Sequence, residues 1–294
     1  MTEHREPLHV LVSVSDTYVM PLSVMLASLL ATNEPRELVV WLLRTGLSDA
    51  NCDLLRRQVE GAGARLEALP VDGAAFAGFP LVPYTSRETY LRLLAGDVLP
   101  ADVHSVLWLD ADLVVRGSLR ELFEADFGQN AAVACGYGAQ MHKDVRANCA
   151  KLGLDPAGYV NAGVLLINLD AWRELDLRAR AREALDAGVP LRYADQDLVN
   201  LVFAGRIGLA ESSVWNLRTN VELSVEELER ARGEARIVHW CGKMKPWMFT
   251  DLPLADVWRS WYERSPFAGK KLRLISRAGL SRMAGRAKER GAHE

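Results

Sequence analysis

Several features that assign proteins to particular classes are missing from this sequence of 294 residues. Its four cysteines lie far apart and form no C-x-x-C pair, which argues against a structural zinc site and favours a reducing compartment. Residues 1–7 are polar, and no run of 18 apolar residues occurs, so the sequence predicts a soluble cytoplasmic chain. The formal net charge of -3 gives no reason to expect nucleic acid as a partner.

Glycine-rich phosphate loops are absent from the start of the chain. It opens with an apolar strand over 8–14, the turn Ser15-Asp16-Thr17-Tyr18 and an apolar helix over 20–31. This order is typical of the nucleotide-binding edge of an α/β sheet. Because the turn holds neither G-x-G-x-x-G nor a P-loop, it favours contact with a base or ribose over contact with phosphate.

What is present is an ordinary globular composition, with 49% hydrophobic residues and enough length for one large or two small domains. Strands are predicted over 37–43 and 64–69, on either side of a helix over 49–60. This alternation predicts a doubly wound α/β fold with a mainly parallel sheet.

A further helix is predicted over 85–94, directly before the next strand. It places Glu88 and Arg92 one turn apart. Arg92 then either pairs with Glu88 on a solvated face or points into a cleft as a cation, and the helical spacing favours neither alternative.

Two aspartates interrupt an apolar run from Ser105 to Val115. Such a run predicts one strand buried on both faces, in which Asp110 and Asp112 point one way and the small Ala111 points the other way. Two neighbouring carboxylates repel each other unless a cation lies between them, so the pair indicates a divalent metal at the carboxyl end of a central strand. The alternative is that the aspartates cap the following turn.

The middle of the chain predicts a strand over 131–135, an excursion of helix and loop over the site from 136 to 158, and a second buried strand over 159–169. This second strand is entered through Asn161-Ala162-Gly163, which predicts a tight turn. An amide followed by two small residues lets a ligand approach the backbone closely, and a plain turn is the alternative.

Two helices are predicted next. The first covers 170–187 and is amphipathic, which indicates a structural role, and the second opens at Asp195-Gln196-Asp197. Capping of the helix N-terminus explains one of these two carboxylates, but not both together with Gln196.

A short strand over 235–238 runs into His239, with Gly242 and Lys245 spaced behind it. One loop thus offers an imidazole, an unencumbered backbone and an ammonium, which a metal-bridged pyrophosphate requires. An imidazole joined to carboxylates favours manganese over magnesium or calcium. A buried core histidine without any ligand is the alternative.

The last segment, 267–294, contains eight Lys and Arg residues against two Glu, together with a modest apolar stripe. This pattern predicts either an interfacial helix that docks on an anionic membrane from the cytoplasmic side or a solvated tail. We therefore divide the chain into a catalytic domain over 1–265 and a basic tail over 266–294.

In combination, these motifs resemble glycosyltransferase family 8, the retaining enzymes that include glycogenin and the galactosyltransferases and glucosyltransferases of lipopolysaccharide biosynthesis. The resemblance covers roughly residues 8–250 and rests on five motifs in register. They are Tyr90-Leu91-Arg92-Leu93, Leu109-Asp110-Ala111-Asp112, Asn161-Ala162-Gly163-Val164, Asp195-Gln196-Asp197 and His239-x-x-Gly242-x-x-Lys245-Pro246-Trp247.

The resemblance implies a GT-A fold with a nucleotide-sugar-binding sheet and a smaller acceptor-side region. It implies that Asp110, Asp112 and His239 hold Mn²⁺, with Mg²⁺ as the alternative, and that this ion bridges the diphosphate of a UDP-sugar. It further implies that Gln196, Asp195 and Lys245 are the catalytic residues. The remaining donor contacts that it implies are Ser15 or Asp16 and Tyr18 at uridine, Gly242 and Lys245 at the diphosphate, and Arg92, Asn161, Asp195 and Gln196 around the hexose. It implies that Ala111, Ala162 and Gly163 also line the donor site.

The function implied is metal-dependent transfer of galactose or glucose from a UDP-sugar, with retention, to a hydroxyl on a glycan, a glycolipid or another cell-envelope or natural-product acceptor. A poor nucleophile such as Gln196 favours a front-face route over a covalent glycosyl-enzyme. A phosphatase would carry its Asp-x-Asp on the opening strand, and a sugar-nucleotide pyrophosphorylase would need a glycine-rich basic loop after that strand. Both stay as alternatives, and a catalytically dead binding module is a third.

Overall fold

A computed structural model describes residues 6–80, 82, 87–138, 141–221 and 223–276. Its centre is a seven-stranded sheet of order β3-β2-β1-β4-β7-β6-β8. Every neighbouring pair is parallel except the two that β7 forms, so the sheet is mainly parallel with one reversed strand. The strands are β1 (Leu8–Ser13), β2 (Leu38–Arg44), β3 (Arg65–Pro70), β4 (Ser105–Leu109), β6 (Ala132–Gly136), β7 (Val160–Asn168) and β8 (Ile207–Ala210).

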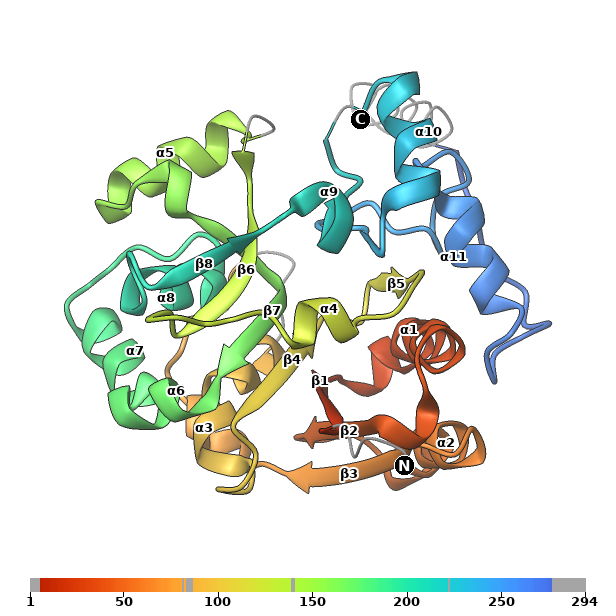
Figure 1. Cartoon of the computed structure of the whole chain (residues 1–294), viewed down its shortest axis with the longest axis horizontal. Coiled ribbons are helices and arrows are strands. Elements are labelled where there is room, and N and C mark those ends of the chain that lie inside the picture. Colours follow the sequence, from red (N-terminus) through yellow and green to blue (C-terminus); the bar gives the residue numbers. More distant parts are fainter. Residues whose placement is uncertain (1–5, 81, 83–86, 139–140, 222, 277–294) are drawn as a thin grey trace, which may run out of the picture.

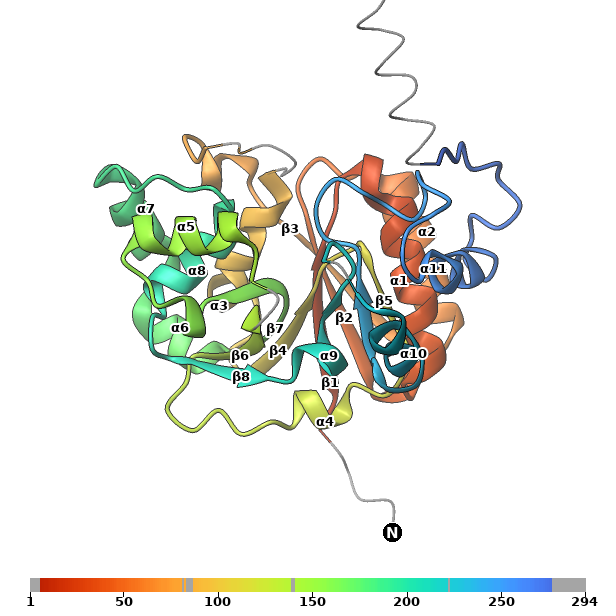
Figure 2. The same cartoon turned by 90° about the horizontal axis from the view of Figure 1, so that it is seen from above.

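Helices cover both faces of this sheet, which is the α/β arrangement predicted (Figures 1 and 2). Alternate side chains of β1 enter two different cores: Val10 and Val12 pack under one face, and Leu11 packs under the other. This explains why the strands are continuous apolar runs rather than alternating ones. On one side are α1 (Val19–Thr32) and α2 (Asp49–Gly61), and on the other α3 (Ala95–Val98), α5 (Lys143–Leu152), α6 (Leu169–Leu175), α7 (Leu177–Asp186) and α8 (Ala194–Val202).

A second, smaller sheet joins segments that are far apart in the sequence. Its order is β5-β10-β9, with β5 (Leu113–Val115) antiparallel and β9 (Leu217–Arg218) parallel to β10 (Ile237–His239). The helices beside it are α9 (Ser212–Trp215), α10 (Val225–Glu234) and α11 (Ala255–Tyr262), and α4 (Arg120–Phe123) follows β5. This sheet brings the end of β10 to the start of β5.

The prediction of one strand over 105–115 is wrong. Strand β4 ends at Leu109, and the chain crosses to the second sheet as β5. The Asp110 N–H donates to the Gly163 carbonyl at 2.9 Å, and the Asp112 carbonyl accepts from the Trp240 N–H at 3.1 Å. Because these backbone groups bond to different sheets, the aspartates lie at the junction and not inside a strand.

Two further predictions fail for local reasons. Asn161–Gly163 is not a turn, because it lies within β7, where a register shift at Ala134/Cys135 of β6 accommodates it. The single helix over 170–187 is broken at Asp176, whose φ of 41° ends α6, and whose side chain caps α7 by accepting from the Ala179 N–H.

The helix over 85–94 is a 3₁₀ helix over Arg87–Leu94, and residues 85–86 lie outside the described part.

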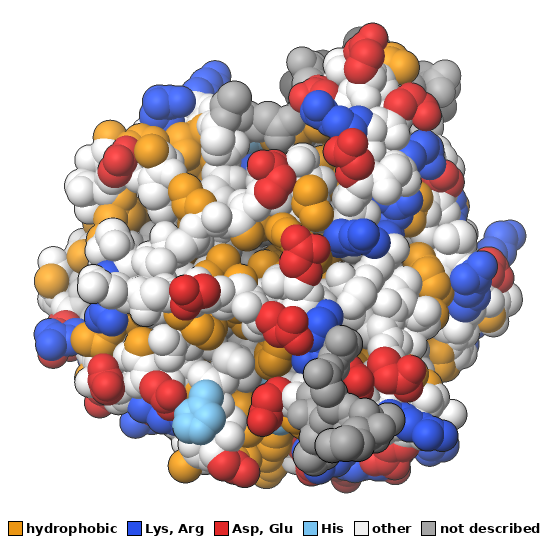
Figure 3. Space-filling model, viewed as in Figure 1, with side chains coloured by type: hydrophobic (Ala, Val, Ile, Leu, Met, Phe, Trp, Pro, Cys, Tyr) orange, Lys and Arg blue, Asp and Glu red, His pale blue; other side chains and the backbone are white. Residues whose placement is uncertain are grey.

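The start of the predicted tail packs against the body: Phe267 and Leu272 contact the core cluster that contains Trp258. The basic residues from Arg277 onwards lie outside the described residues, so the tail and its boundary stay predictions. No helix within the described ranges has the length and apolar character needed to span a membrane. On the face shown in Figure 3, acidic and basic side chains are interspersed, in keeping with the small net charge.

Candidate active site

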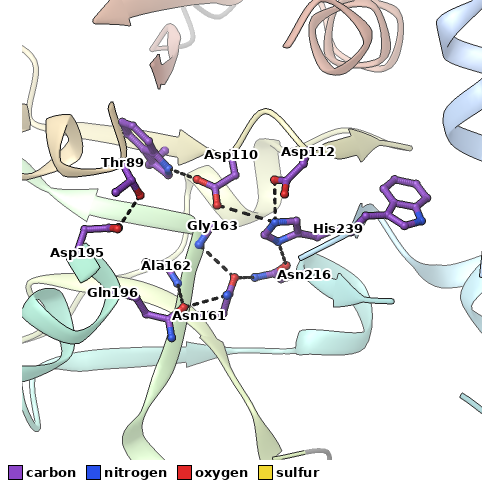
Figure 4. A network of polar contacts seen from close by, with 12 residues as sticks. Thr89, Asp110, Asp112, Asn161, Ala162, Gly163, Asp195, Gln196, Asn216 and His239 are labelled. Carbon is purple, nitrogen blue, oxygen red and sulfur yellow. Dashed lines mark hydrogen bonds and ion pairs between the residues drawn. The ribbon is translucent and has the colours of Figure 1, made fainter. Parts of the chain in front are cut away.

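Three side chains from the junction of the two sheets converge. Asp110 and Asp112 come from the turn between β4 and β5, and His239 comes from the end of β10, 127 residues after Asp112 (Figure 4). The His239 Nε2 atom lies 3.1 Å from Asp112 Oδ1 and 3.8 Å from Asp110 Oδ2. One ligand atom from each residue lies within 4.8 Å of the others, which is the spacing of a metal centre.

Gly163 makes this convergence sterically possible. A Cβ atom added there would lie 2.3 Å from His239 Cε1 and 2.7 Å from Asp110 Oδ2, and neither distance is tolerated. The small residue predicted to permit close ligand approach therefore permits the close approach of two candidate metal ligands to the backbone of β7.

Arg92 points into the site and does not pair with Glu88. Its guanidinium is 3% exposed and lies between two carboxylates, with Nη2 2.9 Å from Asp110 Oδ1 and Nε 2.7 Å from Asp195 Oδ2. It also lies 4.3 Å from the ring centroid of Trp108, whose Nε1 donates to Asp110 Oδ1 at 2.8 Å. Arg92 and Trp108 therefore orient Asp110 towards the other ligands.

A chain of amides leads away from the other side of the imidazole (Figure 4). The His239 Nδ1 atom lies 2.9 Å from Asn216 Oδ1, Asn216 Nδ2 donates to Asn161 Oδ1 at 2.8 Å, and Asn161 Nδ2 donates to Gln196 Oε1 at 3.0 Å. The backbone determines which atom of the Asn161 amide is the oxygen. The Gly163 N–H is a donor, so the Asn161 atom that it contacts must be the acceptor Oδ1, and this fixes the direction of donation along the whole chain.

This direction determines the tautomer of His239. Since Asn216 must donate to Asn161, it presents its oxygen to Nδ1, and Nδ1 must carry the proton. Nε2 is then the nitrogen that faces the two carboxylates. Burial lowers the pKa of His239, but Cys241 and Asp112 outweigh it and raise that pKa, so Nε2 also carries a proton, which a bound metal would displace.

The comparisons with known proteins agree with this geometry. The sequence profile described as Glycosyl transferase family 8 matches residues 9–251, which is more than half of the chain. The chain belongs to glycosyltransferase family 8. Its fold is accordingly the GT-A fold, as predicted.

Several relatives of this glycosyltransferase are known. The lipopolysaccharide 1,2-glucosyltransferase of Escherichia coli is 26% identical over 276 residues, which cover 90% of this chain and 80% of that protein. The lipopolysaccharide 1,3-galactosyltransferase of Salmonella typhimurium is 29% identical over 183 residues, covering 60% and 54%. Among solved structures, galactosyltransferase LgtC in complex with donor and acceptor sugar analogs matches with a TM-score of 0.75 and 29% identity, covering 90% of this chain and 98% of that one.

Lys245 of the glycosyltransferase bonds one of the candidate metal ligands directly. Its ammonium bonds Asp112 Oδ2 and donates to the Trp240 carbonyl at 2.9 Å. Burial raises the pKa of the Asp112 carboxyl, but Lys245 and His239 outweigh it and hold that pKa below its usual value. Burial lowers the pKa of Lys245, yet Asp112 outweighs it and raises the pKa. Asp112 is thus ionised opposite a fixed ammonium.

The two aspartates of α8 have different roles. Asp197 accepts from the backbone N–H groups of Arg192 and Tyr193 at 2.7 and 2.8 Å and from Asn148 Nδ2 at 2.7 Å, so it holds the segment before α8 against the helix. Asp195 instead contacts Arg92 and accepts from Thr89 Oγ1 at 2.6 Å. Burial raises the pKa of Asp195 to about 6, against the opposing effect of Arg92.

Gln196 is held from both ends of its amide. Its Oε1 accepts from the Asn161 side chain and from the Ala162 N–H at 3.3 Å. Its Nε2 donates to the hydroxyls of Tyr137 and Tyr159 at 3.2 and 3.0 Å. The amide is therefore rigid, and its oxygen is already occupied by two donors.

The other predicted residues have partners of their own outside the group of Asp110, Asp112 and His239. Tyr18 is 38% exposed, and its ring meets that of Trp247 edge-on at 5.8 Å between centroids. Asp16 Oδ1 accepts from the Ser48 N–H at 3.0 Å, which ties the β1 turn to α2. The Ser15 hydroxyl bonds Thr17, Ala111 packs against the core, and Gly242 has a φ of 77° in an exposed loop.

Sequence reasoning missed the residues that orient the ligands. Asn216, Thr89 and Trp108 each bond a predicted site residue, yet none was singled out. The one available signal was Asn216, an amide between the large apolar residues Trp215 and Leu217. A buried amide requires partners, so its position pointed to a polar network.

Proposed function

We propose that this glycosyltransferase transfers a hexose, galactose or glucose, from a UDP-sugar to a hydroxyl acceptor with retention of configuration. The proposal includes Mn²⁺, with Mg²⁺ as the alternative, held by Asp110, Asp112 and His239. The observation that carries it is the convergence of two carboxylates and one imidazole from two sheets within 4.8 Å. The names of the relatives, which transfer glucose or galactose to lipopolysaccharide, support a glycan or lipid-linked glycan as acceptor.

The donor set fits the proposed metal. Carboxylate oxygens suit Mn²⁺ and Mg²⁺, and an added imidazole favours Mn²⁺. The amide chain from Asn216 presents Nε2 in the orientation that a ligand requires. When bound, the ion supplies a Lewis acid that neutralises the diphosphate leaving group.

Lys245 supplies a second positive charge for the leaving group. Its ammonium is 7% exposed and already bonds Asp112, so it is fixed beside the candidate metal site. A preorganised cation in a water-poor site stabilises developing charge without reorganisation. Ser15 or Asp16 and Tyr18 bind the uridine, and Gly242 offers its backbone to the diphosphate.

The donor hexose occupies the surface formed by Arg92, Asp195, Asn161 and Gln196. Arg92 and Asp195 offer charged hydrogen-bonding groups for hydroxyls, and burial keeps them out of bulk water. Because the oxygen of Gln196 already accepts two hydrogen bonds, it is poorly placed to act as a nucleophile. We therefore favour a front-face route, in which the leaving phosphate accepts the proton of the acceptor hydroxyl.

The experiment that tests this function is a screen of nucleotide sugars for Mn²⁺-dependent hydrolysis and transfer, with NMR of the anomeric product. We expect a UDP-hexose to be consumed with retention and the reaction to stop when the ion is chelated. Asp112→Asn should abolish turnover, whereas the exposed control Asp126→Asn should not. Full activity after chelation would refute the metal role, and an inverted product would refute the retaining route.

A further inference from the structure

A cavity of about 610 Å³ is lined by residues from the ends of β6 and β8 and from α9 and α10. Figure 1 shows where these four elements lie in the fold. Its volume is within the range of small-molecule sites. Two of its lining residues, Tyr137 and Asn216, also bond Gln196 and His239 of the candidate active site. Because Asn216 meets the Nδ1 side of the imidazole, this cavity lies on the side of His239 opposite to its contact with Asp112.

Arg218 lines this cavity and is the buried cation beside it. Its side chain leaves β9, where its backbone is in register with His239 of β10, and it is 3% exposed. The guanidinium lies 3.9 Å from the ring centroid of Tyr137, and Nη2 donates to the Gly136 carbonyl at 3.3 Å. Its Nε and Nη1 atoms have no hydrogen-bond partner within the described part of the chain.

A buried guanidinium with unbonded nitrogens is an exception to a strong rule. Buried charges in proteins are normally paired, because a buried charge without a partner loses its hydration energy and gains no compensating interaction. The ring of Tyr137 offers part of the compensation, but a π-face does not replace a hydrogen-bond acceptor. An arginine left in this state beside a cavity fits an oxyanion that arrives with a ligand.

None of the three acidic residues that line this cavity, Glu211, Glu227 and Glu234, bonds Arg218 within the described part of the chain. Glu211 is exposed and accepts from both the N–H and the hydroxyl of Ser213, at 3.1 and 2.8 Å. Glu227 accepts from the Ser224 N–H at 2.7 Å within the capping box of α10. The cavity therefore combines the buried Arg218 with exposed side chains of both signs, which are Glu211, Glu234 and Arg230.

We propose that this cavity binds the acceptor and that Arg218 selects an acceptor carrying an anionic group, a carboxylate or a phosphate, on the sugar. The proposal rests on the proposed function, because it assigns the acceptor side of that reaction. Arg218 receives the oxyanion, and the hydroxyl-rich remainder of the sugar lies towards Asn216, Tyr137 and the exposed side chains. A neutral sugar would leave the guanidinium unpaired and would bind more weakly.

The test compares the binding of three sugars to the full chain by calorimetry in the presence of a chelator. The probes are methyl glucuronide, glucose 6-phosphate and neutral methyl glucoside. We expect one or both anionic sugars to bind at least about tenfold more tightly than the neutral one, as charged hydrogen bonds require. The two anionic arms distinguish a carboxylate from a phosphate.

Arg218→Gln should remove this preference, and Arg230→Gln, at the exposed edge of the same cavity, should keep it. Equal binding of all three sugars to the wild-type protein would overturn the proposal, as would a preference that survives Arg218→Gln. If Arg218→Gln does not fold, the proposal is tested on the wild-type protein alone. Its preference for the anionic sugars should then be present at low salt and lost at high salt. Hydrolysis of UDP-hexose by the wild-type protein is measured separately, so failure of the proposed function and failure of this site give different results.

Discussion

Removal of the amide of Asn216 should weaken metal binding without touching a metal ligand. Asn216→Ala deletes the group that accepts the proton of His239 Nδ1 at 2.9 Å. His239 is 2% exposed, and the imidazole loses the side chain that holds its tautomer. Asn161 Oδ1 still accepts from the Gly163 N–H at 3.1 Å, so the defect is confined to the histidine.

The magnitude follows from the buried hydrogen bond. A buried donor left without an acceptor costs about 1–3 kcal/mol, and loss of an orienting partner typically lowers metal affinity by about 10- to 100-fold. We therefore expect the Kd for Mn²⁺ to rise by at least about tenfold, measured by calorimetry or by electron paramagnetic resonance of free Mn²⁺. Asn216→Asp, which restores an acceptor for Nδ1 but sets its second oxygen against Asn161 Oδ1, should recover only part of the affinity.

Asn200→Ala is the matched control. Asn200 is an equally buried amide that bonds the backbone of Val160 at 2.8 and 3.0 Å and contacts no member of the candidate metal centre. It should lower the free energy of unfolding and leave the Mn²⁺ affinity unchanged. Wild-type affinity in Asn216→Ala, or an equal loss in Asn200→Ala, would refute the reasoning.

Three further predictions concern the steric, electrostatic and terminal features of the chain. Gly163→Ala should abolish Mn²⁺ binding in titrations and destabilise the fold by about 1–3 kcal/mol, because its Cβ would lie 2.3 Å from His239 Cε1; unchanged affinity would contradict this. For Asp195, burial raises the folded pKa to about 6, above the unfolded value of 3.8, so its stability contribution is present below pH 4 and lost as pH rises through 6. We therefore expect the free energy of unfolding of the wild type, measured by denaturation at several pH values, to fall by up to about 3 kcal/mol relative to that of Asp195→Asn between pH 4 and 6. A rise in this free energy relative to Asp195→Asn would show that the ion pair with Arg92 outweighs burial. Deletion of 277–294 should reduce sedimentation with anionic vesicles and leave UDP-hexose hydrolysis near normal, and equal sedimentation would exclude lipid docking by this segment.

Elements with strong local patterns were predictable from the sequence. The bounds of β1, β2, β3, α1 and α2 agree with the predicted ranges to within one residue at each end. Their apolar runs and periodic stretches are long. Because helices cover both faces of the sheet, burial determines which residues of these elements are apolar, and the pattern is visible in the sequence. Membership of glycosyltransferase family 8 was also predictable, because its motifs are short local sequences.

Elements whose form depends on a distant partner were not predictable. The break between β4 and β5 exists because the backbone groups of Asp110 and Asp112 bond two different sheets. The helix over 170–187 is different, because it ends early for a local reason: Asp176 adopts a left-handed conformation and caps the next helix. Only the break between β4 and β5 leaves no signal within a window of a few residues.

By itself, the sequence determined the fold class and the identity of the carboxylates and imidazole that form the candidate site, because these follow from apolar patterning and from motif chemistry. The tertiary structure alone decided that Arg92 faces Asp110 and Asp195, that Asn216 sets the tautomer of His239, and that Arg218 lies buried beside a cavity. Each of these depends on distances between side chains from separate elements. Local sequence carries no record of such distances, because the packing of the two sheets creates them.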